Sequence, residues 1–170
     1  MNTPYPTLMN TTTETTQRGF TLLEILISLL ILSVGLLGLA GLQVNGLHSN
    51  QDSYVLTQAM AQAYDMADRM RANMAGFTAG NYNAITTAIP ADPGCITTGC
   101  SSANMALYDA FQWNTANANL LPNGKGTVTT SGNTRIITVM WDQLRNGATG
   151  TGCGGNPAVD LTCFKTSFQP

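Results

Sequence analysis

The sequence predicts an α+β fold in which a long N-terminal helix packs by its C-terminal half on a small antiparallel β-sheet. Three observations predict it: a long apolar segment near the N-terminus, an amphipathic helical pattern that continues from it, and strand-like segments only near the C-terminus. Helix followed by strands, rather than an alternation of the two, is typical of α+β domains. Because only the second half of the helix is amphipathic, we expect its apolar half to protrude.

The composition narrows the classes of function. The chain has 170 residues, a formal net charge of −2 and only 9% charged residues, against about 25% in an ordinary globular domain. The acidic balance argues against charge-driven binding to nucleic acid. His48 is the only histidine, which argues against a histidine-based catalytic triad or a histidine-rich metal site.

Residues 20–42 are apolar apart from a single charge, Glu24, and the uncharged stretch continues to Leu47. This is long enough to cross a bilayer, which takes about 20 helical residues. Residues 1–18 are polar and threonine-rich, and we expect them to be disordered or removed. Three interpretations stay open: a cleaved secretory signal peptide, a plain transmembrane anchor, and a processing site around Gly19. One cation and a long apolar run speak against the first.

The heptapeptide Arg18-Gly19-Phe20-Thr21-Leu22-Leu23-Glu24 resembles the class III signal of type IV pilins and pseudopilins. The resemblance implies that a prepilin peptidase removes residues 1–19 by cutting between Gly19 and Phe20, and that it then methylates the new amine of Phe20. It also implies that Glu24 is the carboxylate used in assembly. Whether translation starts at Met1 or Met9 stays open.

Glu24 has a chemical reason to seek a partner. A charged carboxylate in hydrocarbon costs about 2.5–3.5 kcal/mol, so it is expected to pair or to be protonated. After cleavage the nearest cation is the amine of Phe20, in the same chain or in a neighbouring subunit. An intermolecular pair would neutralise both charges and define the axial register of packed helices. The alternative is a Glu24 that reaches the membrane surface without a partner.

Residues 43–74 continue the helix. Apolar residues recur there at spacings of three and four, and no proline lies between Pro6 and Pro90, so we expect one helix over residues 20–73. Its glycines either form a small-residue packing face or mark a place where the helix bends in a filament: Gly35, Gly38, Gly41 and Gly46. Major pilins usually place a proline in this part. The charged residues near the end of the helix are predicted to form a solvated helix end, with a subunit contact as the alternative: Asp65, Asp68, Arg69 and Arg71.

Residues 75–170 are predicted to form the globular head. Residues 75–103 contain many turn formers and suggest a long loop with local structure. A second helix is expected over residues 104–121, with these buried positions: Ala106, Leu107, Ala110, Phe111, Trp113 and Leu120. Strands are expected over residues 126–131 and 134–142, joined by a turn, and over residues 158–168. Alternation on both faces of 134–142 indicates a central strand.

All four cysteines follow the apolar segment, as expected for disulfides in an oxidising compartment. Three pairings are possible, and we favour the local one, Cys95 with Cys100 and Cys153 with Cys163, because it closes two short loops in regions that lack a core. A zinc site is the alternative, but the spacings are wide for zinc and no histidine is near. We therefore expect no metal.

The helix end around residues 63–73 resembles one branch of the pilin family, the minor pilins called PilV or type IV pilus modification proteins, and later segments resemble it in pieces. This implies a minor pilin that co-assembles through its N-terminal helix and primes pilus assembly in a tip complex. The implied partners are prepilin peptidase, other minor pilins, the major pilin and a tip adhesin. The implied location is the inner membrane, crossed once with a periplasmic head, and then the pilus outside the cell.

No catalytic constellation is apparent, so we expect neither an enzyme nor a cofactor nor a small-molecule substrate. The alternative functions are a minor pseudopilin of a type II secretion system, which shares signal and fold, and a membrane-anchored module that binds DNA or a host surface. The last would need a basic patch built from Lys125, Arg135, Arg145 and Lys165.

Overall fold

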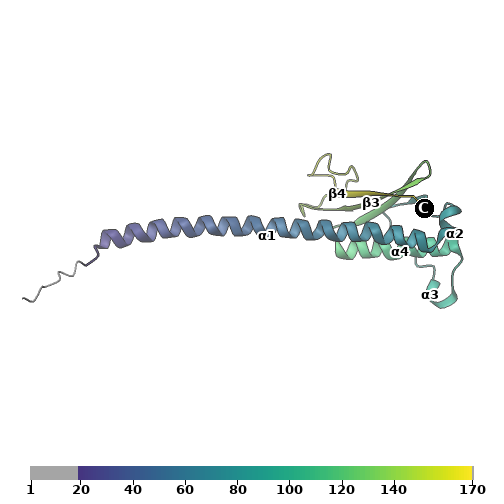
Figure 1. Cartoon of the computed structure of the whole chain (residues 1–170), viewed down its shortest axis with the longest axis horizontal. Helices are drawn as coiled ribbons and strands as arrows, with labels where there is room; N and C mark the ends of the chain where they lie inside the picture. Colours follow the sequence, from purple (N-terminus) through teal and green to yellow (C-terminus); the bar gives the residue numbers. More distant parts are fainter. Residues whose placement is uncertain (1–18, 170) are drawn as a thin grey trace, which may run out of the picture. The chain divides into compact units, whose positions relative to one another are not determined.

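The computed structural model describes residues 19–169, apart from the side chain of Thr98. The expected leader therefore lies outside the described residues except for Gly19. The chain divides into two compact units, one ending at Asn45 and the other beginning at Gly46. The first helix, α1 (Leu22–Ala72), contributes to both units, and each unit is described by itself below (Figure 1).

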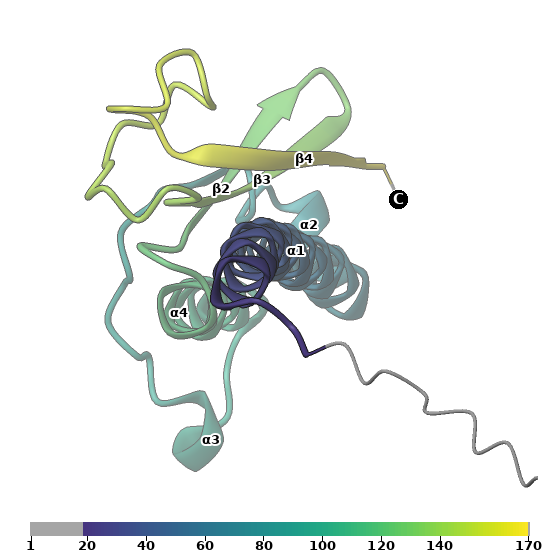
Figure 2. The ribbon, with the colours of Figure 1, turned by 90° about the vertical axis from the view of Figure 1, so that its left-hand side faces the viewer.

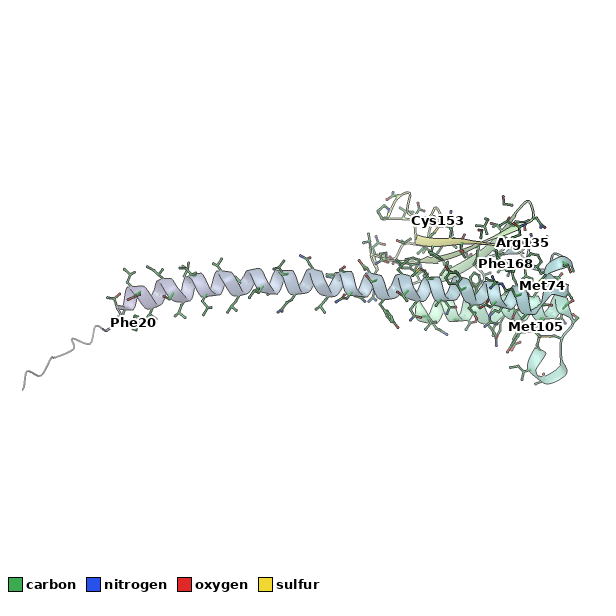
Figure 3. All side chains as sticks on the ribbon, viewed as in Figure 1. Phe20, Met74, Met105, Arg135, Cys153 and Phe168 are labelled. Atoms are coloured by element: carbon green, nitrogen blue, oxygen red, sulfur yellow. A yellow bond between two sulfur atoms is a disulfide. The ribbon has the colours of Figure 1, made fainter. Side chains whose placement is uncertain are left out.

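The first unit consists of the apolar half of α1. All of its described residues are exposed, and their side chains extend outward from the helix (Figure 3). Among residues 19–169, α1 is the one helix that is long and apolar enough to cross a membrane by length and composition. Leucine, a good helix former, is frequent in it, and its backbone groups are hydrogen-bonded within the helix, as a lipid environment would require.

The second unit is built around the end of α1. Six residues at helical spacing are buried there: Val55, Ala59, Ala63, Met66, Ala67 and Met70. The second long helix, α4 (Ser102–Leu120), runs back along α1. Its Trp113 is fully buried and donates its indole N–H to the carbonyl oxygen of Gln62 at 2.7 Å. Figure 2 shows α4 and the end of α1 on the same side of the sheet.

The predicted second helix is confirmed, but two of its predicted core residues are wrong. Leu107 and Leu120 are 43% and 48% exposed. Polar residues occupy the buried face in their place, namely Asp109, Asn114 and Asn117. Asn114 can be buried because its side-chain amide forms hydrogen bonds with the backbone. It accepts the N–H of Gly126 and donates to the carbonyl oxygen of Thr86. Hydropathy alone does not reveal such bonds.

The sheet has four antiparallel strands in the order β1-β2-β3-β4: β1 (Ala84–Ile85), β2 (Lys125–Ser131), β3 (Thr134–Trp141) and β4 (Thr162–Phe168). The predicted hairpin and the central position of its second strand are confirmed. On the inner face of β3, Ile137, Val139 and Trp141 join the core formed with α1 and α4. On the outer face, Met140 packs with Leu161 and Ala148 in a smaller cluster.

The last strand begins later than expected, at Thr162, and Val159 is 55% exposed. The long loop contains three short elements: α2 (Met74–Thr78), β1 and α3 (Cys95–Thr98). The two-residue β1 has too little sequence for a periodic pattern. It exists because Ala84 and Ile85 pair with Thr129 and Val128 of β2.

Two disulfides hold the irregular segments. One joins Cys95 to Cys100 around α3, and the other joins Cys153 to Cys163, which ties the loop after β3 to β4 (Figure 3). No cysteine is free, so none is available as a thiolate ligand for the alternative zinc site.

Candidate functional site

The candidate assembly site lies at the start of α1. Glu24 occupies the first helical turn, where the positive end of the helix dipole favours an anion. Phe20 precedes the helix, and both residues line one shallow depression of about 350 Å³ together with Ile25 and Leu29. The structure thus places Phe20 and Glu24 on one face of the first unit.

Thr21 is a residue that the sequence reasoning missed. It precedes the first helical residue, and its hydroxyl oxygen accepts the backbone N–H of Glu24 at 3.2 Å. Thr followed three residues later by Glu is the spacing of a capping box, and this spacing was the available signal. The cap uses the backbone of Glu24 and leaves its carboxylate for another partner.

Among residues 19–169, the carboxylate of Glu24 forms no ion pair, and the ion pairs found there join Arg69 and Arg71 to aspartates. Two serine side chains of this half are satisfied locally. The hydroxyls of Ser28 and Ser33 donate to the carbonyl oxygens of Glu24 and Leu29, four residues earlier. Glu24 is therefore the charged group of this half whose carboxylate has no partner in the described part of the chain, and in lipid it would need one.

The four helical glycines do not interrupt α1. A Cβ atom added at Gly35, Gly38, Gly41 or Gly46 would meet nothing within 4 Å. In the part of the chain that the structure describes, no other element packs on them. Both interpretations, a packing face for other helices and a place of bending, therefore depend on neighbouring subunits.

The charged end of α1 differs from the expected solvated helix end. Arg69 donates to Asp65 at 2.7 Å, and it also reaches α4, where it donates to Asp109 at 3.3 Å and Gln112 at 2.8 Å. Burial acts to lower the pKa of Arg69, but the two aspartates outweigh it, and the pKa lies above its ordinary value. Only the pair of Arg71 with Asp68, at 2.5 Å, is solvated as predicted.

The four basic residues of the alternative DNA-binding patch do not gather. Lys165 lies on the outer face of the sheet, where it lines a depression with Thr138. Arg135 is buried on the inner face with its guanidinium over Phe77. Arg145 lines a different depression with Gln51. The structure therefore separates three of the cations that this function would need together.

The described part of the chain offers no metal centre. Residues 19–169 contain no group of three or more His, Cys, Asp or Glu residues that could hold a metal ion. His48 lines a depression of about 230 Å³ together with Asp52 and Asp142. Asp142 is occupied there, because its carboxylate accepts the backbone N–H groups of Asn146 and Gly147.

Two family models match the chain. Residues 15–40 match the model described as the prokaryotic N-terminal methylation motif. Residues 41–111 match the model described as type IV pilin Tt1218-like. No curated protein and no solved structure gives a significant match. The first match covers Phe20 and Glu24, and the second covers the end of α1 and half of α4.

Proposed function

We propose that this chain is a type IV pilin, and that it is a minor subunit that co-assembles into the pilus and helps to prime its assembly. The matches to two family models over residues 15–40 and 41–111 support this proposal. The family is structural rather than enzymatic. One observation carries the proposal: a helix half with every described side chain exposed contains a single charged group, Glu24. Such a surface is unfavourable in water and needs lipid or other helices around it.

Before assembly, the apolar half of α1 anchors the subunit in the inner membrane, crossing it once with the head in the periplasm. The hydrogen bonds of Ser28 and Ser33 to their own helix support this, because polar groups in lipid must be satisfied internally. The two disulfides support an oxidising compartment for the head. After assembly, the subunit lies in the pilus outside the cell.

The methylation motif implies processing by prepilin peptidase and assembly with other pilins. We assign the cleavage to the bond between Gly19 and Phe20, and the methylation to the Phe20 amine. Glu24 then pairs with the Phe20 amine of a neighbouring subunit. The position of Phe20 and Glu24 on one depression supports this pairing, because one approaching helix can reach both. The ion pair neutralises both charges within the apolar interior of the packed helices.

A minor role, as in PilV, is supported by Gly41, which stands in the part of the helix where major pilins usually carry a proline. In this role the partners are other minor pilins, the major pilin and a tip adhesin, and the subunit acts in a tip complex. Deletion of the gene should therefore abolish or reduce piliation. Loss of protein export with normal piliation would contradict the proposal and favour a type II secretion pseudopilin.

Glu24→Ala tests the assembly role. We expect normal cleavage, seen by mass spectrometry as a mature chain that begins with N-methylated Phe20. Recovery of the variant in sheared pili should fall about tenfold or more, because loss of the pair costs at least the 1.4 kcal/mol that corresponds to a factor of ten. Ser33→Ala is the matched control, since Ser33 lies in the same helix half and bonds only its own backbone.

Normal recovery of Glu24→Ala in the pili would contradict the pairing. A mature chain that begins downstream of the apolar segment, near residue 41, would overturn the whole proposal, because the assembly helix would then be absent from the finished protein.

A further inference from the structure

Arg135 is a buried cation without an anionic partner. The residue is 7% exposed, and its Nε atom is fully buried without a hydrogen-bond acceptor. The ion pairs of residues 19–169 involve Arg69 and Arg71 but not Arg135. Buried charges in proteins are normally paired and hydrogen-bonded. Arg135 therefore requires an explanation that the isolated chain does not supply.

The position of Arg135 makes its charge unusual. It lies on the inner face of β3, where the following inward positions hold Ile137, Val139 and Trp141. Charged residues that point inward protect the open edges of some sheets. This reason does not apply to β3, because it is hydrogen-bonded to β2 on one side and to β4 on the other.

Aromatic rings hold the guanidinium in place. The Arg135 guanidinium carbon lies 4.6 Å from the centre of the Phe77 ring, and Phe77 packs edge-on against Phe168 at 5.5 Å. On the other side of this pair, Arg71 lies 4.9 Å from the Phe168 ring centre. Figure 3 shows Arg135, Phe168 and Met74 at the same end of the second unit. Two guanidinium groups thus flank one pair of phenylalanines.

The rings balance part of the positive charge but accept no conventional hydrogen bond. A guanidinium has five N–H donors. In the described part of the chain, no hydrogen bond is found for Nη1 or Nη2 of Arg135, and neither is among the fully buried unpaired atoms. These two nitrogens are therefore the part of the side chain that an acceptor can reach from solvent.

We propose that Arg135 is a binding site for an oxyanion, with a carboxylate of a neighbouring pilin subunit as its physiological occupant. A carboxylate matches the fork of a guanidinium with two parallel hydrogen bonds. The aromatic stack holds that fork in advance, which reduces the entropy lost on binding. Arg71 on the Phe168 ring is already paired with Asp68, so Arg135 is the guanidinium of the two that has no anion among residues 19–169. The source of the carboxylate rests on the proposed function, whereas the binding chemistry does not.

The binding chemistry is tested on the full chain in detergent micelles. Backbone amide resonances of residues 134–136 are followed during titration with sodium acetate or sodium phosphate, with sodium chloride at equal ionic strength as the reference. We expect a saturable shift with the oxyanions and not with chloride. Arg135→Met should abolish it, and Arg135→Lys should weaken binding about tenfold or more, because an ammonium lacks the fork. Arg145→Met, which removes an exposed cation elsewhere, should leave the titration unchanged.

Arg135→Met also separates binding from structure. Replacing a buried charge by an apolar side chain of similar size is often neutral or stabilising, so we expect an equal or higher Tm together with loss of the anion response. An absent shift in the wild type, or the same shift in Arg135→Met, would overturn the site. If Arg135→Met does not fold, Arg135→Lys decides the same question.

The source of the carboxylate is tested in piliated cells. A photo-crosslinking amino acid at Asn133, in the exposed turn beside Arg135, should form a bond to an Asp- or Glu-containing segment of another pilin subunit. Adding Arg135→Met should remove this product and lower recovery of the subunit in sheared pili. An anion response without a subunit crosslink and with normal recovery would show a site for an adventitious ion only, and would overturn the subunit as occupant. The proposed function would be unaffected, because it is tested at Glu24.

Discussion

At the scale of single residues, the second unit depends on a buried polar network between α1, α4 and the chain that links them. Asp109 is 6% exposed and accepts hydrogen bonds from Arg69 and from the hydroxyl of Tyr82. Asn73 donates to that hydroxyl at 3.0 Å and to the carbonyl of Ser102 at 2.7 Å. In a low-dielectric interior such bonds reinforce one another, and an unpaired member is costly.

Asp109→Ala should therefore destabilise the protein by about 3 kcal/mol, because it leaves Arg69 and Tyr82 without their shared acceptor. Asp68→Ala is the matched control. It removes a solvated ion pair with Arg71, in which the side chains of Arg71 and Asp68 are 60% and 72% exposed. The change should cost less than about 1 kcal/mol of stability. Urea unfolding followed by tryptophan fluorescence measures both. Equal effects of the two changes would contradict a structural role for Asp109.

Tyr82→Phe tests the same network through pH. Burial and the hydrogen bond to Asp109 raise the pKa of Tyr82 above its ordinary value of about 10. Because the folded protein holds this proton more tightly than the unfolded chain, the resulting stability is fully present below pH 10 and is lost as the pH rises beyond it. Tyr82→Phe should lower the free energy of unfolding at neutral pH by about 1 kcal/mol. Above pH 10, the variant should lose less of its remaining stability than the wild type does. Parallel pH profiles for the two proteins would contradict this origin of the alkaline loss.

At the scale of elements, the contact of α4 with β2 depends on two glycines, Gly124 and Gly126. A Cβ atom at Gly126 would lie 2.4 Å from the ring of Trp113, and one at Gly124 would lie 2.0 Å from the carbonyl oxygen of Asn117. The missing side chains let β2 approach the helix closely enough for Asn114 to accept the N–H of Gly126 at 2.8 Å.

Gly126→Ala should destabilise the protein by about 1–3 kcal/mol, since the added methyl group forces Trp113 or β2 to move. Gly46→Ala should instead stabilise α1 by up to about 1 kcal/mol, because alanine is the better helix former and nothing lies within 4 Å. Thermal unfolding should show a lower Tm than the wild type for Gly126→Ala and a higher Tm for Gly46→Ala. A neutral Gly126→Ala would show that the contact between α4 and β2 is loose.

At the scale of the whole molecule, the described core belongs to the second unit. Among residues 19–169 the first buried residue is Val55, and the described residues of the unit that ends at Asn45 contribute none. The hydrophobic effect that stabilises the head therefore acts among residues 55–168.

Residues 46–170, produced alone, should fold in water with a Tm within a few degrees of that of the full chain in detergent, because no core contact has been removed. Circular dichroism and thermal unfolding under oxidising conditions provide the measurement. An unfolded or aggregated fragment would show that the apolar half of α1 stabilises the head as well as anchoring it.

Several features follow from the sequence because they depend on local chemistry. Periodic patterns of apolar residues predict the extent of α1, the hairpin of β2 and β3, and the second helix. The segment that matches the methylation motif is equally local, since Phe20, Thr21 and Glu24 lie within one stretch around the first helical turn. Even the overlooked cap of Thr21 follows a spacing that the sequence shows.

Only the tertiary structure decided which polar residues are buried and with which partners. Arg69 in α1 and Asp109 in α4 are far apart in the chain, and a surface pair and a buried pair have the same sequence pattern. Arg135, read as one cation of a surface patch, lies under the sheet on Phe77. Its environment comes from α2 and β4, segments that meet only when the chain is folded. Burial depends on contacts between distant segments, and a sequence pattern records only neighbours along the chain.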